Sequence, residues 1–68
     1  MASTQFVKAL QDQIGHEFDA HQQYVAIATY FETLTMPQMA ALFYAQALEE
    51  RDHAMMMVRY LLDQDEPV

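Results

Sequence analysis

Apolar residues recur at intervals of three and four along both halves of the chain, a spacing typical of amphipathic helices. In the first half the stripe comprises Leu10, Ile14, Glu17, Tyr24, Ala28 and Phe31. In the second half it comprises Phe43, Ala47, Ala54, Met57 and Leu61, which surround Glu50 and His53. The pattern predicts an all-α fold, in which a helix over about residues 4–32, a turn over about 33–35 and a helix over about 36–63 form an antiparallel hairpin.

Residues with capping chemistry stand at the start of each expected helix. Ser3 or Thr4 can accept a hydrogen bond from the free amides of the first helix. Thr35 and Gln38 have the spacing of a capping box, and Pro37 falls in the first turn, where its missing N–H costs nothing. We therefore expect the second helix to begin near residue 36, with Thr35 as its capping side chain.

The chain is short for a protein that folds alone. With 68 residues and no cysteine, a two-helix hairpin buries too little apolar surface to offset its chain entropy, and no disulfide can assist it. Hydrophobic residues nevertheless make up 53% of the sequence, too many for a disordered segment. We expect residues 1–68 to form a single hairpin, half of a four-helix bundle that is completed by association with another copy or segment.

The charge of the chain excludes some classes of partner. Ten acidic residues against three basic ones give a net charge of −7, which argues against nucleic acid and anionic membranes as partners. No apolar run approaches the roughly 20 residues that a bilayer crossing requires. The N-terminus lacks the basic start and apolar core of a secretory signal, so we expect a cytoplasmic protein.

Two glutamates stand at matching depths across the expected turn. If the chain reverses at Leu34, Glu17 lies 17 residues before that point and Glu50 lies 16 after it, at nearly the same height. His53 follows Glu50 by three residues and projects from the same side of the helix. A carboxylate on an apolar stripe is costly to bury unless it is paired, protonated or bound to a cation. The three residues therefore favour a metal site on or beside the buried stripe.

Three segments resemble the first two helices of ferritins, especially the non-haem bacterial kind. They are Gln13-Ile14-Gly15-His16-Glu17-Phe18, Gln22-Gln23-Tyr24-Val25-Ala26 and Glu49-Glu50-Arg51-Asp52-His53-Ala54. The resemblance covers nearly the whole chain. It implies a ferritin-like fold and the oxidation of Fe(II) to Fe(III) by dioxygen or peroxide at a diiron carboxylate site. It also implies storage of the product as a ferric mineral inside a cage of subunits.

The resemblance assigns roles to four residues. Glu17 resembles the terminal carboxylate ligand of the first iron, His53 its nitrogen ligand, and Glu50 the carboxylate that bridges both irons. The alternative is a set of partly buried polar residues that satisfy one another. Tyr24 resembles the tyrosine beside the diiron centre, where its phenol can bond a ligand or pass an electron, and it is our catalytic candidate. An interior tyrosine with a bonded hydroxyl is the alternative.

Other polar residues near these positions receive a plainer interpretation. Glu49 resembles an auxiliary carboxylate that some ferritins use near the inner surface, but a solvated glutamate is the better interpretation. His21 follows Glu17 by four residues, and we favour a hydrogen-bonded or exposed histidine over a metal ligand. The haem-binding bacterioferritins have a methionine at the position of Arg51, so no haem is expected.

The resemblance ends with the second helix. A ferritin subunit has four helices, and the residues that complete the second iron position come from the other two. Two copies of this chain would restore a four-helix bundle with four glutamates and two histidines. The plainer alternative is a truncated ferritin or one piece of a longer subunit. Two further classes stay open: another di-metal helical-bundle enzyme, rubrerythrin-like or encapsulated-ferritin-like, and a non-catalytic helical interaction module.

Overall fold

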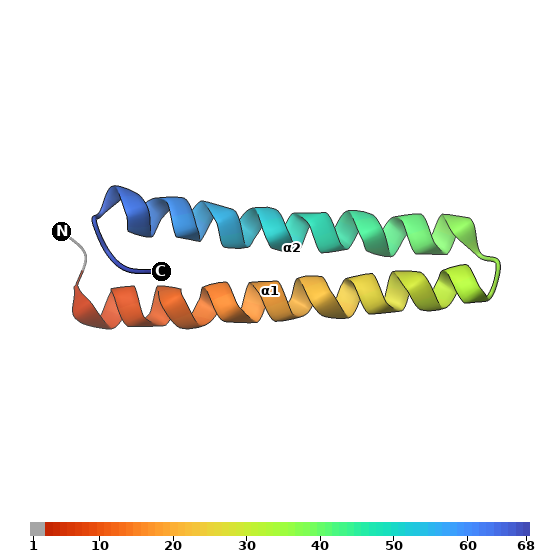
Figure 1. Cartoon of the computed structure of the whole chain (residues 1–68), viewed down its shortest axis with the longest axis horizontal. Coiled ribbons are helices and arrows are strands. Elements are labelled where there is room, and N and C mark those ends of the chain that lie inside the picture. The colour runs from red at the N-terminus through yellow and green to blue at the C-terminus, as the bar shows by residue number, and fades with distance from the viewer. Residues whose placement is uncertain (1–2) are drawn as a thin grey trace.

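Two long helices and the turn between them make up the structure (Figure 1). The computed structural model describes residues 3–68, in which α1 spans Thr4–Thr33 and α2 spans Pro37–Asp63. The helices run antiparallel, side by side along their length, and the described part of the chain contains no strand. The all-α helical hairpin predicted from the sequence is confirmed.

The two helices begin differently. At α1 the Ser3 hydroxyl accepts a hydrogen bond of 3.1 Å from the Phe6 amide, as the sequence predicts. At α2 the expected capping box is wrong, because Pro37 is the first helical residue and the cap position therefore falls on Met36, which makes no side-chain cap bond. Thr35 takes a left-handed conformation instead, with φ of 57°, and so carries the chain around the turn.

Both helices end in a Schellman motif, in which two amides beyond the helix bond back to its last carbonyls. After α1 the Thr35 amide donates to the Glu32 carbonyl and the Met36 amide to the Phe31 carbonyl, both at 3.0 Å. After α2 the Asp65 and Glu66 amides donate to the Leu62 and Leu61 carbonyls at 3.1 and 2.8 Å. The left-handed residues that this motif requires are Thr35 and Asp65, neither of which is glycine.

Small side chains form the seam between the helices. The buried residues of α2 recur every seven positions and are Ala40, Ala47, Ala54 and Leu61. The buried residues of α1 are Val7, Ile14 and Ala28. Because the distance between two packed helices depends on the side chains at their contact, alanines allow a close approach. The backbone of one helix therefore comes within reach of side chains from the other.

Aromatic rings pack across the hairpin on both sides of its middle. Toward the chain termini, Phe6 and Tyr60 meet edge to face with ring centroids 5.8 Å apart. Toward the turn, Phe43 stacks between Tyr24 and Phe31, with centroid distances of 6.1 and 5.5 Å. These contacts supplement the thin alanine seam. Within residues 3–68, neither helix has the long apolar stretch that a membrane crossing requires.

Candidate metal centre

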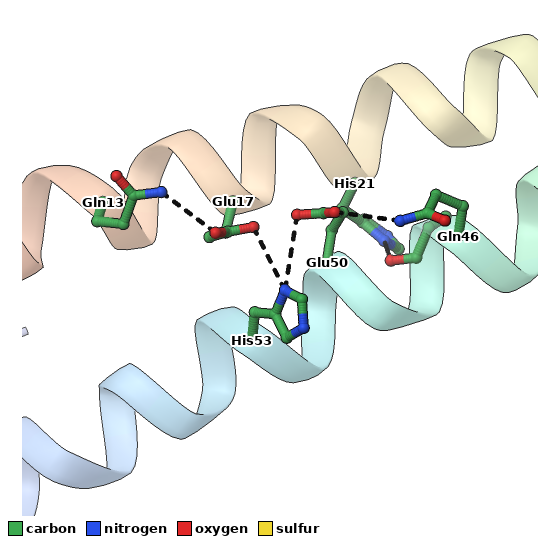
Figure 2. A network of polar contacts seen from close by, with 7 residues as sticks. Gln13, Glu17, His21, Gln46, Glu50 and His53 are labelled. Atoms are coloured by element: carbon green, nitrogen blue, oxygen red, sulfur yellow. Dashed lines mark hydrogen bonds and ion pairs between the residues drawn. The ribbon is translucent and has the colours of Figure 1, made fainter.

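Three side chains of types that can bind a metal ion meet midway along the hairpin (Figure 2). Glu17 comes from α1, and Glu50 and His53 come from one face of α2. One donor atom of each lies within 4.8 Å of the other two. The His53 Nδ1 atom is 3.9 Å from the Oε2 atom of each carboxylate. The structure thus brings together the three residues that the sequence singled out as candidate ligands.

The group lies near the middle of both helices. Glu50 has 13 helical residues on either side in α2, and Glu17 lies 13 residues after the start of α1 and 16 before its end. In the middle of a helix every backbone amide and carbonyl has a partner within the helix, whereas the end turns lack some. The ligands are therefore presented by well-supported backbone.

A glutamine four residues before each glutamate orients its carboxylate. The Gln13 side-chain amide donates to Glu17 Oε1 at 3.2 Å, and the Gln46 amide donates to Glu50 Oε1 at 3.3 Å. Both bonds leave the Oε2 atom turned toward His53 (Figure 2). The roles of these glutamines were not predicted from the sequence, although their four-residue spacing places both partners on one helical face and would have indicated them.

The two carboxyl groups shift each other's pKa in opposite directions. Their mutual hydrogen bond, assisted by the Gln13 amide, lowers the pKa of Glu17. The same bond, together with desolvation, raises the pKa of Glu50, so Glu50 takes up a proton more readily than Glu17 does. Two adjacent carboxylates ionise together readily only when a positive charge lies between them. A cation bound between the two carboxylates would meet that need, so the donor set fits a metal ion.

His53 departs from the expectation of a site on or beside the buried stripe. The side chains of Glu17 and Glu50 are 16% and 17% exposed, but that of His53 is 53% exposed. The hairpin is a single layer of two helices, so nothing in residues 3–68 covers the side on which the imidazole lies. This side leaves an approach from solvent to the three donors.

The other candidates lie outside the group. Tyr24 stacks on Phe43, and the described structure shows no hydrogen bond from its hydroxyl to any of the three ligands. His21 points across the hairpin, with Nδ1 2.7 Å from the Ala47 carbonyl oxygen. Glu49 is exposed. The catalytic role of Tyr24 stays a prediction.

A helical hairpin that joins two carboxylates and an imidazole at mid-height has the architecture of half a di-metal carboxylate bundle. Residues 7–68 match the family model described as the ferritin-like domain. The chain belongs to this family, as the resemblance in its sequence predicted.

Several ferritins are similar to the chain. It is 61% identical over 62 residues to Ferritin BfrB of Mycolicibacterium smegmatis, an alignment covering 91% of this chain and 34% of the relative. Ferritin BfrB of Mycobacterium tuberculosis (strain Erdman) is 58% identical over 62 residues, again 91% of this chain and 34% of the relative. Bacterial non-heme ferritin of Staphylococcus aureus (strain USA300) is 36% identical over 63 residues, 93% of this chain and 38% of the relative. The chain thus spans about a third of the length of these relatives.

Proposed function

We propose that this chain binds Fe(II) as a substrate through Glu17, Glu50 and His53, and takes part in its oxidation to Fe(III) and in storage of the product as a ferric mineral. The observation that carries the proposal is the convergence of three ligands from two helices, with both Oε2 atoms turned toward one imidazole. Membership of the ferritin-like family supports it. The proposed setting is the cytoplasm, and the proposed oxidant is dioxygen or peroxide.

The donor set suits iron in both oxidation states. Carboxylate oxygens are hard ligands that favour Fe(III), whereas imidazole is a suitable ligand for Fe(II). In the proposed arrangement Glu17 and His53 bind one ion, and Glu50 bridges to a second. Because a carboxylate must be deprotonated to bind metal, the raised pKa of Glu50 opposes iron binding at low pH. The exposed side of His53 is the side on which a second set of ligands would complete the site.

A second copy of the chain is the proposed partner. Three ligands are too few for a complete dinuclear site, and two hairpins together would supply four glutamates and two histidines, the ligand set of symmetric di-iron bundles. Because the ligands lie near the middle of each helix, a twofold axis perpendicular to the helices would align the two sets while keeping the hairpins fully overlapped. A larger cage of subunits is proposed for a chain that carries the remaining helices.

Tyr24 is proposed to act on the oxidation step and not on iron binding. Its ring stacks on Phe43, about two helical turns from Glu17, and a phenol can pass an electron or orient a ligand. The Tyr24→Phe variant should therefore bind Fe(II) with unchanged affinity and oxidise it more slowly.

Anaerobic titration with Fe(II), followed by admission of air, tests the proposal. The chain should bind about two ions per pair of hairpins, and air should produce the absorbance of ferric carboxylate species. Glu50→Gln, which removes one negative charge at the site, should abolish binding. Asp52→Asn removes one negative charge from an exposed position on the same helix and should leave binding unchanged.

Other outcomes would indicate the alternative classes. Binding of Mn(II) or Zn(II) without any oxidation of Fe(II) would favour another di-metal enzyme. A folded, associated chain that binds no metal, and whose assembly is unaffected by Glu17→Ala, would favour a non-catalytic interaction module. Either result would contradict the proposed iron oxidation by this chain.

A further inference from the structure

His21 links the two helices directly beside the metal-ligand group. Its Nδ1 atom, on α1, lies 2.7 Å from the carbonyl oxygen of Ala47 on α2, in a partly buried position (Figure 2). His21 follows Glu17 by four residues, and Ala47 precedes Glu50 by three. The bond therefore joins the two helical turns adjacent to the carboxylates. Apart from the contact between the Glu17 and Glu50 carboxyl groups, the other side-chain hydrogen bond between the helices among the described residues is that of Tyr44 with Glu32, near the turn.

The chemistry of the acceptor defines the state of the histidine. A carbonyl oxygen can only accept, so Nδ1 of His21 carries the hydrogen and donates it. The Ala47 oxygen retains a second lone pair after accepting the amide of its own helix, so this bond does not require the helix to open. The alanine seam explains how the ring reaches it, because buried Ala40, Ala47 and Ala54 allow the helices to approach closely.

The alanine seam alone offers little resistance to sliding of one helix along the other. Alanine methyl groups form a shallow surface, and a slip of one residue along a helix shifts a ligand by about 1.5 Å. Glu17 and Glu50 also repel each other whenever both are ionised. A directional hydrogen bond one turn away opposes both the slip and the separation. Metal sites need their ligands held within about 0.5 Å of the productive geometry.

We propose, building on the iron-binding function above, that His21 is a positioning residue whose bond to the Ala47 carbonyl fixes the register of α1 against α2, so that Glu17, Glu50 and His53 are in place before a metal arrives. The residue acts through the backbone of the opposite helix and does not contact the ion.

A distance measurement on the metal-free chain tests the register. Because the sequence contains no cysteine, spin labels can be attached through Asp19→Cys and Asp52→Cys, two exposed positions on opposite helices. Pulsed electron resonance should give a narrow distance distribution for the parent chain and a broadened or shifted one after His21→Leu. His21→Asn should restore the narrow distribution, since its amide nitrogen is joined to Cγ just as Nδ1 is. A broad distribution in the parent, or a narrow one in His21→Leu, would overturn the proposal.

Anaerobic Fe(II) affinity gives the second readout. His21→Leu should weaken binding by about tenfold, a loss typical of groups that support metal ligands without touching the ion, and His21→Asn should bind nearly as tightly as the parent. Tyr44→Phe is the matched control, because it removes the other interhelical hydrogen bond and should leave affinity almost unchanged. Equal affinities for the parent and His21→Leu would contradict the proposed role.

Two further comparisons keep the outcomes distinct. If His21→Leu does not fold, the contrast between His21→Asn and His21→Gln decides, because glutamine places its amide one bond too far and should bind Fe(II) more weakly than asparagine. If the parent binds no metal, the proposed iron chemistry fails, and the spin-label distances still decide whether His21 sets the register.

Discussion

Each glutamate in the metal-ligand group divides its two oxygens between two tasks. Oε1 accepts a glutamine amide from its own helix, and Oε2 faces His53. The depth of Glu17 and Glu50 could be predicted from the sequence, because a constant helical rise converts residue number into height. The exposure of His53 could not, because it depends on what covers the hairpin and not on the helix that carries the residue.

Metal affinity should increase with pH through the raised pKa of Glu50. Below that pKa an entering ion must displace the proton of the Glu50 carboxyl group, and above it Glu50 is already ionised. Titration with Co(II) at a series of pH values should show affinity that rises and then levels off, with about one proton released per ion at the acidic end. Affinity that does not change with pH would show that the carboxyl pair takes no part in binding.

The pKa shifts of Glu17 and Glu50 have opposite effects on the stability of the metal-free chain as the pH changes. The lowered pKa of Glu17 stabilises the fold above the ordinary glutamate pKa, and this contribution is lost as the pH falls through the lowered pKa. The raised pKa of Glu50 stabilises the fold at low pH, and this contribution is lost as the pH rises through the raised pKa. The two contributions to stability therefore oppose each other as the pH changes.

Both helices were predictable as elements because apolar periodicity and the caps agree along the whole chain. Five of the residues in the predicted stripes are buried: Ile14, Ala28, Ala47, Ala54 and Leu61. The start of α2 was not predictable. The spacing of Thr35 and Gln38 matched a capping box, whereas Pro37 is the first helical residue and the cap position falls on Met36. The only glycine in the sequence is in mid-helix, whereas the two positions with positive φ among residues 3–68 carry other residues.

Gly15→Ala should stabilise the hairpin. An added methyl group meets no atom within 4 Å, and alanine is favoured over glycine in a helix by about 0.8–1 kcal/mol. Chemical denaturation should show an increase of that order in the free energy of unfolding. The Fe(II) affinity should stay the same, because the added methyl group meets no atom and so does not disturb Glu17. Weaker Fe(II) binding by Gly15→Ala would indicate that the site requires a residue without a side chain at position 15.

Thr35→Gly should also stabilise the hairpin. A left-handed backbone costs most residues roughly 1–2 kcal/mol and glycine almost nothing, so part of that cost should be recovered. Thr33→Gly is the matched control, since Thr33 is helical and its replacement should lower stability. Thermal unfolding of the two variants distinguishes them, and a loss of stability in Thr35→Gly would refute the strain at the turn.

At the scale of the whole molecule, the hairpin is a rod of 49 × 15 × 12 Å that exposes 4947 Å². A compact protein of this mass exposes only about 4,400 Å². Large apolar side chains remain on several faces, including Phe6, Phe18, Tyr30, Leu42, Leu48 and Met56. The open apolar surface favours association, and the net charge of −7 opposes it.

Self-association should therefore increase with ionic strength. Salt screens the repulsion between acidic copies but leaves the apolar contacts intact. Light scattering after size-exclusion chromatography should give a mass of two or more chains at high salt and a smaller average mass at low salt. A monomer at every salt concentration and protein concentration would contradict pairing of hairpins.

The central placement of the ligands has a consequence for heating. Helices open from their ends, where backbone groups lack partners, so the first turns to melt are those farthest from Glu17 and Glu50. Amide hydrogens around the two glutamates should be the last to exchange with solvent. Fraying of the helix ends and disruption of the metal-ligand group therefore become separate events. The hairpin can lose outer turns at both ends while the side chains of Glu17, Glu50 and His53 stay together.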